Sequence, residues 1–303
     1  MKKEPKIFAI IVTYKGMRWY DKCFSSLRES TIPLQTVVVD NTPGDEDAEY
    51  IRAHFPEIHI IKTKENLGFG KANNLGMRYA LDNRCDYVFL LNQDTWIEKD
   101  SIAGLVEVAE EHPEYGILSP MHLNADHTIV NAIIGIGKEY RNENLLSDLY
   151  LNQIQDVYET NYVNAAAWLL PRKTMEIVGG FDPIFEHYEE DDNYLNRAIY
   201  HKLKIGICPK TFITHDHQGS RLSNDRLWYR RQQYWLVDWT DINQPFSMGR
   251  ELRYCFRKWI SYVCSGNKKK ASYIWSQWRY CWSRRNEIKR SREENIQVKS
   301  SWL

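Results

Sequence analysis

Apolar runs and amphipathic segments alternate along the first 111 residues of the chain. Continuous runs rich in Val and Ile predict buried strands at 7–14, 36–41, 58–63 and 87–91. Apolar positions at helical spacing predict helices at 19–30, 45–55, 71–81 and 99–111. Apolar strands separated by helices are typical of parallel sheets. The pattern therefore predicts an α/β fold, a Rossmann-like and mostly parallel sheet with helices on both faces.

The pattern becomes mixed after about residue 115. Further strands are expected at 116–119, 128–134, 162–170, 204–208 and 211–215. Residues 139–160 are polar and irregular, which favours a loop or lid. Residues 220–303 have helical character, for example in 225–239 and 272–285. We therefore expect a main domain over residues 1–219 and a helical extension over 220–303.

Polar side chains stand at the ends of three predicted strands. These ends are Thr13 with Tyr14, Asp40 with Asn41, and Asn92 with Gln93 and Asp94. In open α/β sheets ligands bind beyond the carboxyl ends of the strands, so a site assembled from these residues is the simplest interpretation. The alternative is turn chemistry, because Asn and Asp form local hydrogen bonds in turns. It explains Asp40 and Asn41 more easily than all three ends together.

A segment with two glycines, ENLGFGKANN, follows the third predicted strand at residues 65–74. Gly68 and Gly70 permit close approach of the backbone to a ligand, and the helix that follows offers free N–H groups to an anion. The segment matches neither of the common phosphate-loop patterns, and it follows the third strand rather than the first. A turn with Asn caps is an equally good interpretation.

Carboxylates are concentrated in the segment GGFDPIFEHYEEDDNYLNRA, residues 179–198, before a helix-like stretch at 193–203. Just before that stretch stand Glu186, His187, Glu189, Glu190, Asp191 and Asp192. The helix dipole and capping explain one or two of them. A carboxylate held at a helix start beside a cleft would suit a base acting on a bound hydroxyl, so the cluster is either a site or a solvated face.

Two histidines, His215 and His217, end the last predicted strand. Neutral imidazole suits Mn²⁺-like ions, whereas carboxylate and water suit Mg²⁺ or Mn²⁺. A single histidine beside a strand is more often structural than a metal ligand, so the pattern alone leaves both interpretations open.

The end of the chain is basic and rich in tryptophan. Residues 220–303 contain 18 Lys and Arg against 7 Asp and Glu, and 8 of the 11 tryptophans, although the whole chain has a formal net charge of zero. Trp275, Trp278 and Trp282 share one helical face. This face either packs on the main domain or lies on an anionic membrane, where Trp and Arg favour the interface. Nucleic acid is not expected, because no nucleic-acid-binding motif accompanies the charge.

The sequence contains no apolar run long enough to span a membrane, and the apolar run after residue 6 is too short for a signal peptide. The six cysteines are scattered without a CxxC pair, so neither a zinc ribbon nor a disulfide framework is expected. We expect a cytoplasmic protein that is peripheral on the inner face of the cell membrane if the basic tail binds lipid.

Six motifs together resemble those of the family 2 inverting nucleotide-sugar glycosyltransferases, particularly the bacterial rhamnosyltransferase-like branch. They are, in order, IIVTY, VVVDN, ENLGFGKANN, LLNQDT, GGFDPIFEHYEEDDNYLNRA and THDHQGS, and the resemblance covers roughly residues 7–235. It implies a GT-A fold, with a nucleotide-sugar half at about 1–120 and an acceptor half at about 121–219. It also implies metal-dependent, inverting transfer of a sugar from a nucleoside-diphosphate sugar. The acceptor would be a hydroxyl of a glycan or lipid-linked molecule, as in surface polysaccharide synthesis.

The resemblance assigns donor contacts by position. Thr13 and Tyr14 would border the nucleotide, and Asp40 would hydrogen-bond the base. Asn66 and Gly68 would lie along the nucleotide-sugar. The element LLNQDT would add Asn92 and Gln93 to the donor site.

The resemblance also assigns the metal ligands and the base. Asp94 matches the last Asp of the family's DxD-type element, which binds Mn²⁺ or Mg²⁺, and Asn92 replaces the first Asp. His215 matches a histidine that the family places near the metal and diphosphate. Asp191, with Glu190 as its neighbour, matches the residue presumed to deprotonate the acceptor hydroxyl. Glu189 stands where many relatives have Gly, and Asp192 follows the pair of Glu190 and Asp191. The resemblance therefore leaves the base open between Asp191 and Asp192.

Two other functions share parts of this pattern. A sugar-nucleotide nucleotidyltransferase would have the same α/β core and metal, but it normally carries a glycine-rich, basic loop directly after the first strand, which VTYKGMRW matches poorly. A catalytically inactive nucleotide- or glycan-binding scaffold is the second alternative. The presence of Asp94, Asp191 and His215 argues against it.

Overall fold

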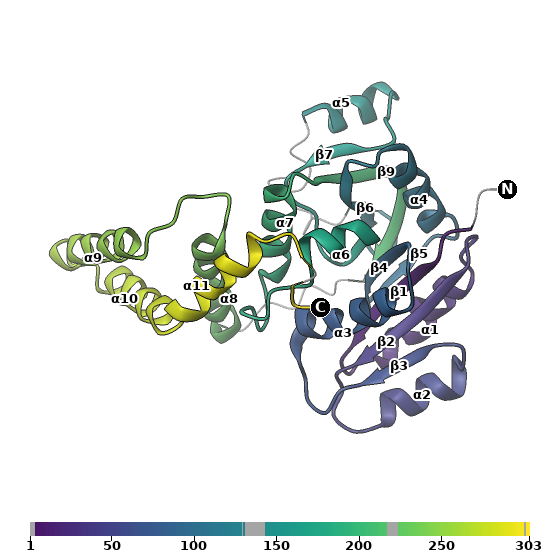
Figure 1. Cartoon of the computed structure of the whole chain (residues 1–303), viewed down its shortest axis with the longest axis horizontal. Helices are drawn as coiled ribbons and strands as arrows, with labels where there is room; N and C mark the ends of the chain where they lie inside the picture. Colours follow the sequence, from purple (N-terminus) through teal and green to yellow (C-terminus); the bar gives the residue numbers. More distant parts are fainter. Residues whose placement is uncertain (1–3, 129, 131–142, 217–223, 300) are drawn as a thin grey trace.

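The computed structural model describes residues 4–128, 130, 143–216, 224–299 and 301–303. Within them, a nine-stranded sheet flanked by helices forms the main body, and helices from the end of the chain stand beside it (Figure 1). The strand order is β3-β2-β1-β4-β8-β6-β9-β5, and β7 pairs with β9. Six strands run in one direction, and β5, β7 and β8 run against them. The predicted α/β fold with a mostly parallel sheet is confirmed.

The first four strands form a parallel half of the sheet. They are β1 (Ile7–Thr13), β2 (Leu34–Asp40), β3 (His59–Lys62) and β4 (Tyr87–Asn92). The register pairs Thr13 with Asp40 across β1 and β2, and Val12 with Asn92 across β1 and β4. The polar residues that end these strands therefore lie along one edge of the sheet.

The other half of the sheet is mixed. Its strands are β5 (Thr95–Ile97), β6 (Tyr115–Leu123), β7 (Tyr158–Thr160), β8 (Ala167–Pro171) and β9 (Lys204–His215). The two strands predicted at 204–208 and 211–215 are one continuous strand, because β9 passes through the intervening Pro209 with a shift of register against β6. β5 and β7 were not predicted, since three residues are too few to display a period of two.

Three sequence predictions need correction here. Residues 143–160 are not irregular throughout, because they contain α5 (Glu143–Leu151) and β7, whose Tyr158 is buried against β9. Residues 139–142 lie outside the described residues. Of the strand predicted at 128–134, only Thr128 and Val130 are among the described residues. Val130 forms an isolated bridge to Leu123. The strand predicted at 162–170 begins only at Ala167.

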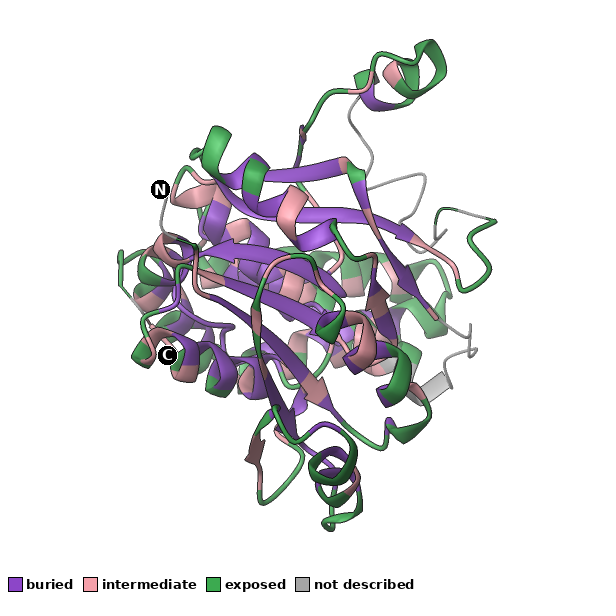
Figure 2. Ribbon diagram, turned by 90° about the vertical axis from the view of Figure 1, so that its right-hand side faces the viewer, coloured by how far each residue is buried: buried purple, intermediate pink, exposed green. Residues whose placement is uncertain are grey.

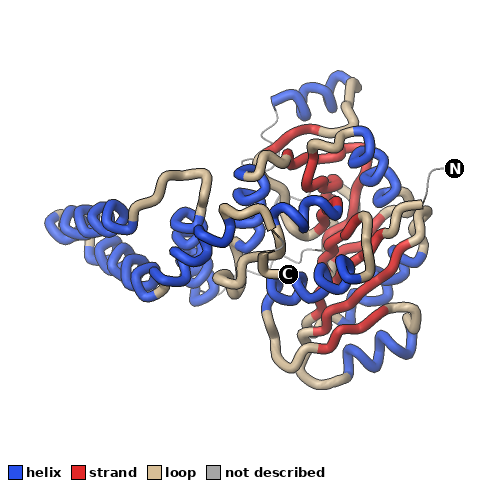
Figure 3. The backbone as a smooth tube through the Cα atoms, viewed as in Figure 1, coloured by secondary structure: helices blue, strands red, loops and turns tan. Residues whose placement is uncertain are grey.

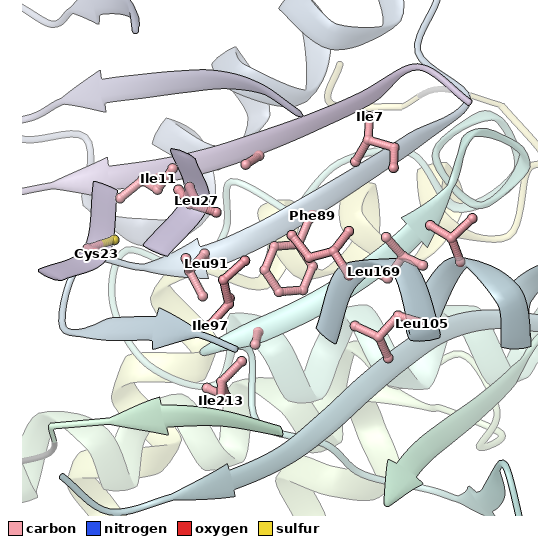
Figure 4. Packing of buried hydrophobic residues seen from close by; sticks show 14 of the residues in the cluster. Ile7, Ile11, Cys23, Leu27, Phe89, Leu91, Ile97, Leu105, Leu169 and Ile213 are labelled. Atoms are coloured by element: carbon pink, nitrogen blue, oxygen red, sulfur yellow. The ribbon is translucent and has the colours of Figure 1, made fainter. Parts of the chain in front are cut away.

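Two layers of helices cover the sheet, and alternate residues of each strand face one layer or the other. The first layer contains α1 (Met17–Arg28), α2 (Glu46–His54) and α4 (Ser101–Glu111). The second contains α3 (Gly68–Asp82), α6 (Arg172–Val178) and α7 (Glu190–Tyr200). Ile7 and Ile11 of β1 pack with the first layer (Figure 4), whereas Phe8 and Ile10 pack with the second. Figure 2 shows the resulting buried centre.

The end of the chain forms four helices beside the sheet (Figure 3). They are α8 (Asn224–Thr240), α9 (Met248–Cys264), α10 (Lys268–Ser283) and α11 (Arg285–Asn295). A third apolar cluster joins them to Ile184 and Phe185 of the acidic segment. The buried carboxylate of Asp182 accepts hydrogen bonds from Ser291 and Asn295 of α11. None of the helices in the described part of the chain is long and apolar enough to cross a bilayer.

Candidate functional site

Asp40 lies at the end of β2, where it is completely buried. One carboxylate oxygen accepts hydrogen bonds from the Thr13 hydroxyl at 3.3 Å and from the backbone N–H of Thr42 at 2.8 Å. The other is 2.7 Å from the ammonium group of Lys62 at the end of β3. Lys62 was not singled out in the sequence, because one Lys at a strand end carries no distinctive pattern. The pair compensates the buried charge of Asp40 and fixes the start of the loop after β2.

The side chain of Gln93 links the loops after β4 and β1. Its amide oxygen accepts a hydrogen bond from the backbone N–H of Tyr14 at 2.9 Å, and its amide nitrogen donates to the Tyr14 carbonyl at 3.2 Å. A Cβ atom at Gly16 would collide with the same amide group. The Tyr14 ring remains 41% exposed at the edge of the sheet. Gln93 thus fixes the position of that ring through the backbone.

The glycine-containing segment at 65–74 is held between the sheet and the acidic segment. Asn41 donates from its side chain to the carbonyl of Gly68 at 3.0 Å, and Asn66 accepts from the Gly68 N–H at 2.9 Å. Gly68 has φ +79°, a conformation that favours glycine, and a Cβ atom there would collide with the carbonyl of Glu186. The glycine is therefore required where this loop meets the acidic segment.

Asp94 and His215 come together from distant parts of the sequence. Asp94 follows β4, and His215 ends β9 opposite Thr95 of β5. The Nε2 atom of His215 is 3.5 Å from Oδ1 of Asp94, with the Asp94 side chain 21% exposed and the His215 side chain 6% exposed. The next residue, Asp216, donates its N–H to the Asp94 carbonyl and accepts from the Trp19 indole at 3.1 Å. His217 lies outside the described residues.

A further buried histidine, His122 of β6, lies beside this pair. Its ring meets the His215 ring edge to face at 6.1 Å between centroids. Burial, and next the proximity of His215, lower the His122 pKa to about 3, so the ring is neutral. Its Nδ1 atom is buried without a hydrogen-bond partner. No sequence pattern pointed to His122, because it sits inside an apolar strand.

Asp94 and His215 provide the chemistry of a divalent-metal site with two protein ligands. Carboxylate oxygen and imidazole nitrogen both suit Mn²⁺, and carboxylate suits Mg²⁺. Among the described residues no group of three or more His, Cys, Asp or Glu side chains could hold an ion alone. The pair therefore fits an ion whose remaining ligands come from water and from a bound diphosphate.

The acidic segment turns sharply into α7. Tyr188 and Glu189 both have positive φ angles, 67° and 68°, which are unusual for residues with side chains. The Glu189 carboxylate is buried and 3.0 Å from Nε of Arg230 on α8. Sequence reasoning missed Arg230, because one Arg in a basic helix is not distinctive. This ion pair connects the start of α7 to the C-terminal helices.

Asp191 lies in the first turn of α7, partly buried. Its Oδ2 atom accepts a hydrogen bond from the Tyr162 hydroxyl at 3.4 Å, and its Oδ1 atom accepts from the N–H of Asp192 at 3.0 Å. Burial, and next the charge of Asp192, raise the Asp191 pKa to about 6. The carboxylate is therefore mostly ionised at neutral pH and is a stronger base than an exposed Asp.

Glu190 differs from Asp191 although the two are adjacent. Its side chain is 6% exposed, and its Oε2 atom is buried without a hydrogen-bond partner. Burial, and next the charge of Asp191, raise the Glu190 pKa to about 8. The pKa of Glu189 is also raised, chiefly by burial. Glu190 is therefore largely protonated at neutral pH, when Asp191 is ionised.

The segment before β8 connects the Asp94 and Asp191 regions. Asn92 donates its N–H to the carbonyl of Ala166 at 2.9 Å, and Tyr162, four residues earlier, contacts Asp191. The side chain of Asn74 in α3 binds both the N–H and the carbonyl of Phe181. The segment 162–166 therefore links the end of β4, which precedes Asp94, to the start of α7, and Asn74 links α3 to the acidic segment.

Comparison with known families and proteins gives an independent result. Residues 8–144 match the family model described as glycosyl transferase family 2. The low-salt glycan biosynthesis hexosyltransferase Agl10 of Haloferax volcanii is 28% identical over 210 residues, covering 68% of this chain and 66% of the relative. The dTDP-rhamnosyl transferase RfbF of Shigella flexneri is 24% identical over 211 residues, covering 69% and 68%. The chain thus spans about two thirds of the length of these relatives.

Solved structures resemble the fold at low sequence identity. TarS 1–349 of S. aureus, in complex with UDP, has a TM-score of 0.54 and 13% identity, covering 82% of this chain and 68% of that structure. GalNAc-T7, with UDP, GalNAc and Mn²⁺, has a TM-score of 0.56 and 13% identity, covering 98% and 56%. The fold is therefore similar to that of GT-A glycosyltransferases, as the motifs implied.

Proposed function

We propose that this chain, whose residues 8–144 match the glycosyl transferase family 2 model, moves a sugar from a nucleoside-diphosphate sugar to a hydroxyl of a glycan or lipid-linked acceptor. One observation carries the proposal. The metal-type pair Asp94–His215 follows the end of β4, and segment 162–166 joins that strand end to the ionisable carboxylate of Asp191, with Ala166 bonded to Asn92 and Tyr162 bonded to Asp191. UDP complexes among the structural neighbours, and relatives named as hexosyl- and rhamnosyltransferases, support it.

The proposed donor site lies along the polar strand ends. Tyr14 offers an exposed ring for the nucleotide, and Gln93 fixes its backbone. Both oxygens of Asp40 already have partners in the protein, so Asp40 acts on the donor chiefly by positioning the Thr13 and Thr42 region. The remaining donor contacts of the proposal are Asn66, Gly68 and Asn92.

Asp94 and His215 would hold Mn²⁺ or Mg²⁺ in this proposal. When bound, the ion would stabilise negative charge on the leaving diphosphate by several kcal/mol. Asp94 supplies the only carboxylate of this pair, so we expect ion affinity to depend strongly on the donor diphosphate. His122 supports the site by packing its neutral ring against His215.

Asp191 is the proposed base. The acceptor oxygen must lose a proton as it attacks the anomeric carbon from the face opposite the leaving group, and a base is most effective when its pKa lies near the working pH. With a pKa of about 6, Asp191 meets that condition, whereas Glu190, with a pKa of about 8, is largely protonated. One carboxylate suffices for inversion, because the reaction needs no covalent glycosyl-enzyme intermediate.

The test combines donor binding with turnover. Thermal unfolding is measured with a panel of nucleoside-diphosphate sugars, with and without Mn²⁺, and we expect one donor to raise the midpoint only when Mn²⁺ is present. Asp94→Asn should remove the Mn²⁺-dependent part of this shift. Failure of every donor to change the midpoint, with or without Mn²⁺, would contradict the proposed function.

Turnover then separates the proposed base from its neighbour. With that donor and an acceptor, Asp191→Asn should lower kcat by about 10²- to 10⁴-fold with the donor-induced midpoint shift retained. Asp192→Asn is the matched control, because it changes the adjacent carboxylate on the same helical turn. If Asp192→Asn abolished turnover and Asp191→Asn did not, the base would be Asp192.

A further inference from the structure

The helices α9 and α10 form a hairpin that extends away from the sheet (Figures 1 and 3). The hairpin contacts the rest of the protein at its base, through α8 and α11. Residues 248–285 contain ten Lys and Arg but only one acidic residue, Glu251, which gives a local charge of about +9. None of the proposed donor-site residues lies in this basic segment.

A continuous row of aromatic rings lies along the hairpin. Phe256 and Trp259 of α9 have ring centroids 5.9 Å apart, and Trp259 lies 5.5 Å from Trp275 of α10. Trp275 stacks on Trp278 at 4.9 Å, and Trp278 stacks on Trp282 at 5.9 Å. Phe256, Trp275 and Trp282 are 52%, 41% and 39% exposed. The tryptophan stripe seen in the sequence therefore packs against α9 rather than the sheet, and part of it faces solvent.

A groove of about 430 Å³ opens between the two helices on this side. Its apolar lining includes Phe256, Ile274 and Trp275, and Arg253 and Arg257 contribute to its wall. Ile260 and Val263 continue the stripe of Phe256 at helical spacing, 42% and 51% exposed. Solvent-exposed apolar residues in one continuous stripe, beside a groove, are typical of an interaction surface.

We propose that this face of the hairpin docks on an anionic lipid bilayer. The aromatic and aliphatic residues would enter the boundary between headgroups and acyl chains, and the groove would receive part of one chain. Arg253 and Arg257 border this apolar surface, at the level where lipid phosphates would meet them. Trp and Arg on one amphipathic surface favour such an interface, and basic residues near it attract anionic headgroups.

The charge distribution favours a bilayer over other occupants. A second copy of the chain would place one strongly basic surface against another, which is unfavourable in a two-fold interface. A nucleic acid would satisfy the positive charge but would leave Ile260, Val263 and the apolar groove without partners. A bilayer with anionic lipids satisfies both the charge and the apolar stripe.

The experiment measures sedimentation of the full-length protein with vesicles of phosphatidylcholine alone or with 30% phosphatidylglycerol, without donor or metal. We expect at least tenfold stronger partitioning onto the anionic vesicles, reduced by high salt. The double variant Phe256→Ser/Trp275→Ser should weaken that binding at least tenfold. Tyr254→Ser is the matched control, because Tyr254 is 51% exposed on the same helix but points away from the groove side by helical spacing, and it should bind within twofold of the parent.

Several results would overturn the proposal. Equal binding to both vesicle types, or equal loss in the double variant and the control, would do so. A concentration-dependent dimer in analytical ultracentrifugation would also overturn it, if the double variant abolished that dimer. Binding of duplex DNA without binding of vesicles would do the same. Each variant's donor-induced midpoint shift is measured in parallel. Because the vesicle assay needs neither donor nor turnover, its outcome is separate from that of the proposed glycosyl transfer.

Discussion

Glu190 should destabilise the protein at neutral pH, and Glu190→Gln should relieve the cost. The residue is 6% exposed, has one oxygen without a partner, and lies beside the acidic side chains of Glu189, Asp191 and Asp192. Ionisation in that environment is unfavourable, whereas in the unfolded chain the carboxylate is free to ionise. Gln has nearly the same shape and no charge, so the substitution removes the titration while keeping the packing.

The magnitude follows from the two pKa values. Glu190 has a pKa of about 8 in the folded protein against an ordinary value of 4.5. Because the folded pKa is the higher one, the folded state binds the extra proton. The contribution of Glu190 to stability is therefore most favourable below pH 4.5 and becomes less favourable as pH rises towards 8. One pH unit corresponds to about 1.4 kcal/mol, so at pH 7 the cost is roughly 3 kcal/mol. At pH 5.5 the cost is roughly half of that by the same relation.

The assay is urea unfolding of parent and variant at pH 7.0 and pH 5.5, with a chelator and without donor. We expect Glu190→Gln to be more stable by roughly 3 kcal/mol at pH 7.0, with an advantage about half as large at pH 5.5. Glu107→Gln is the control, because Glu107 is exposed on α4 and its variant should match the parent at both pH values. An advantage independent of pH, or a loss of stability at pH 7.0, would refute the reasoning.

Three further effects are expected. The ratio kcat/KM should fall about tenfold per pH unit below pH 6 and level off above it, because Asp191 must be ionised to act as base; a profile flat down to pH 5 would contradict this. In urea unfolding, Gly68→Ala should lower the free energy of unfolding by more than about 1 kcal/mol, because φ +79° and the Glu186 carbonyl both oppose a side chain. The control Gly249→Ala has open space around it and should lower the free energy of unfolding by less. Arg230→Met should destabilise the protein in the same assay, because it leaves the buried Glu189 carboxylate without its cation, and an unchanged midpoint would show that this pair is unimportant.

The sequence predicted the elements of the first half of the chain closely. Strand and helix boundaries from β1 to α4 differ from the predictions by three residues at most, apart from the short β5 that was missed. These elements are long, and each repeats its apolar period several times, so local pattern is a sufficient guide. In the second half the strands are short or depend on partners far along the chain, as for β7 and the single strand β9. Local pattern alone cannot define such strands, because their boundaries are set by pairing.

The candidate site shows the same division. The residue types and their order along the chain are enough to identify Asp94, Asp191 and His215 as candidates, and a role for them in glycosyl transfer stays a prediction. Only the tertiary structure places His215 3.5 Å from Asp94, because β9 returns beside β5 after more than one hundred residues. It also separates Glu190 from Asp191 by burial, which raises one pKa to about 8 and the other to about 6. The amino-acid sequence determines which ionisable groups exist, whereas distance and exclusion of water, which decide their charge, arise only when the chain is folded.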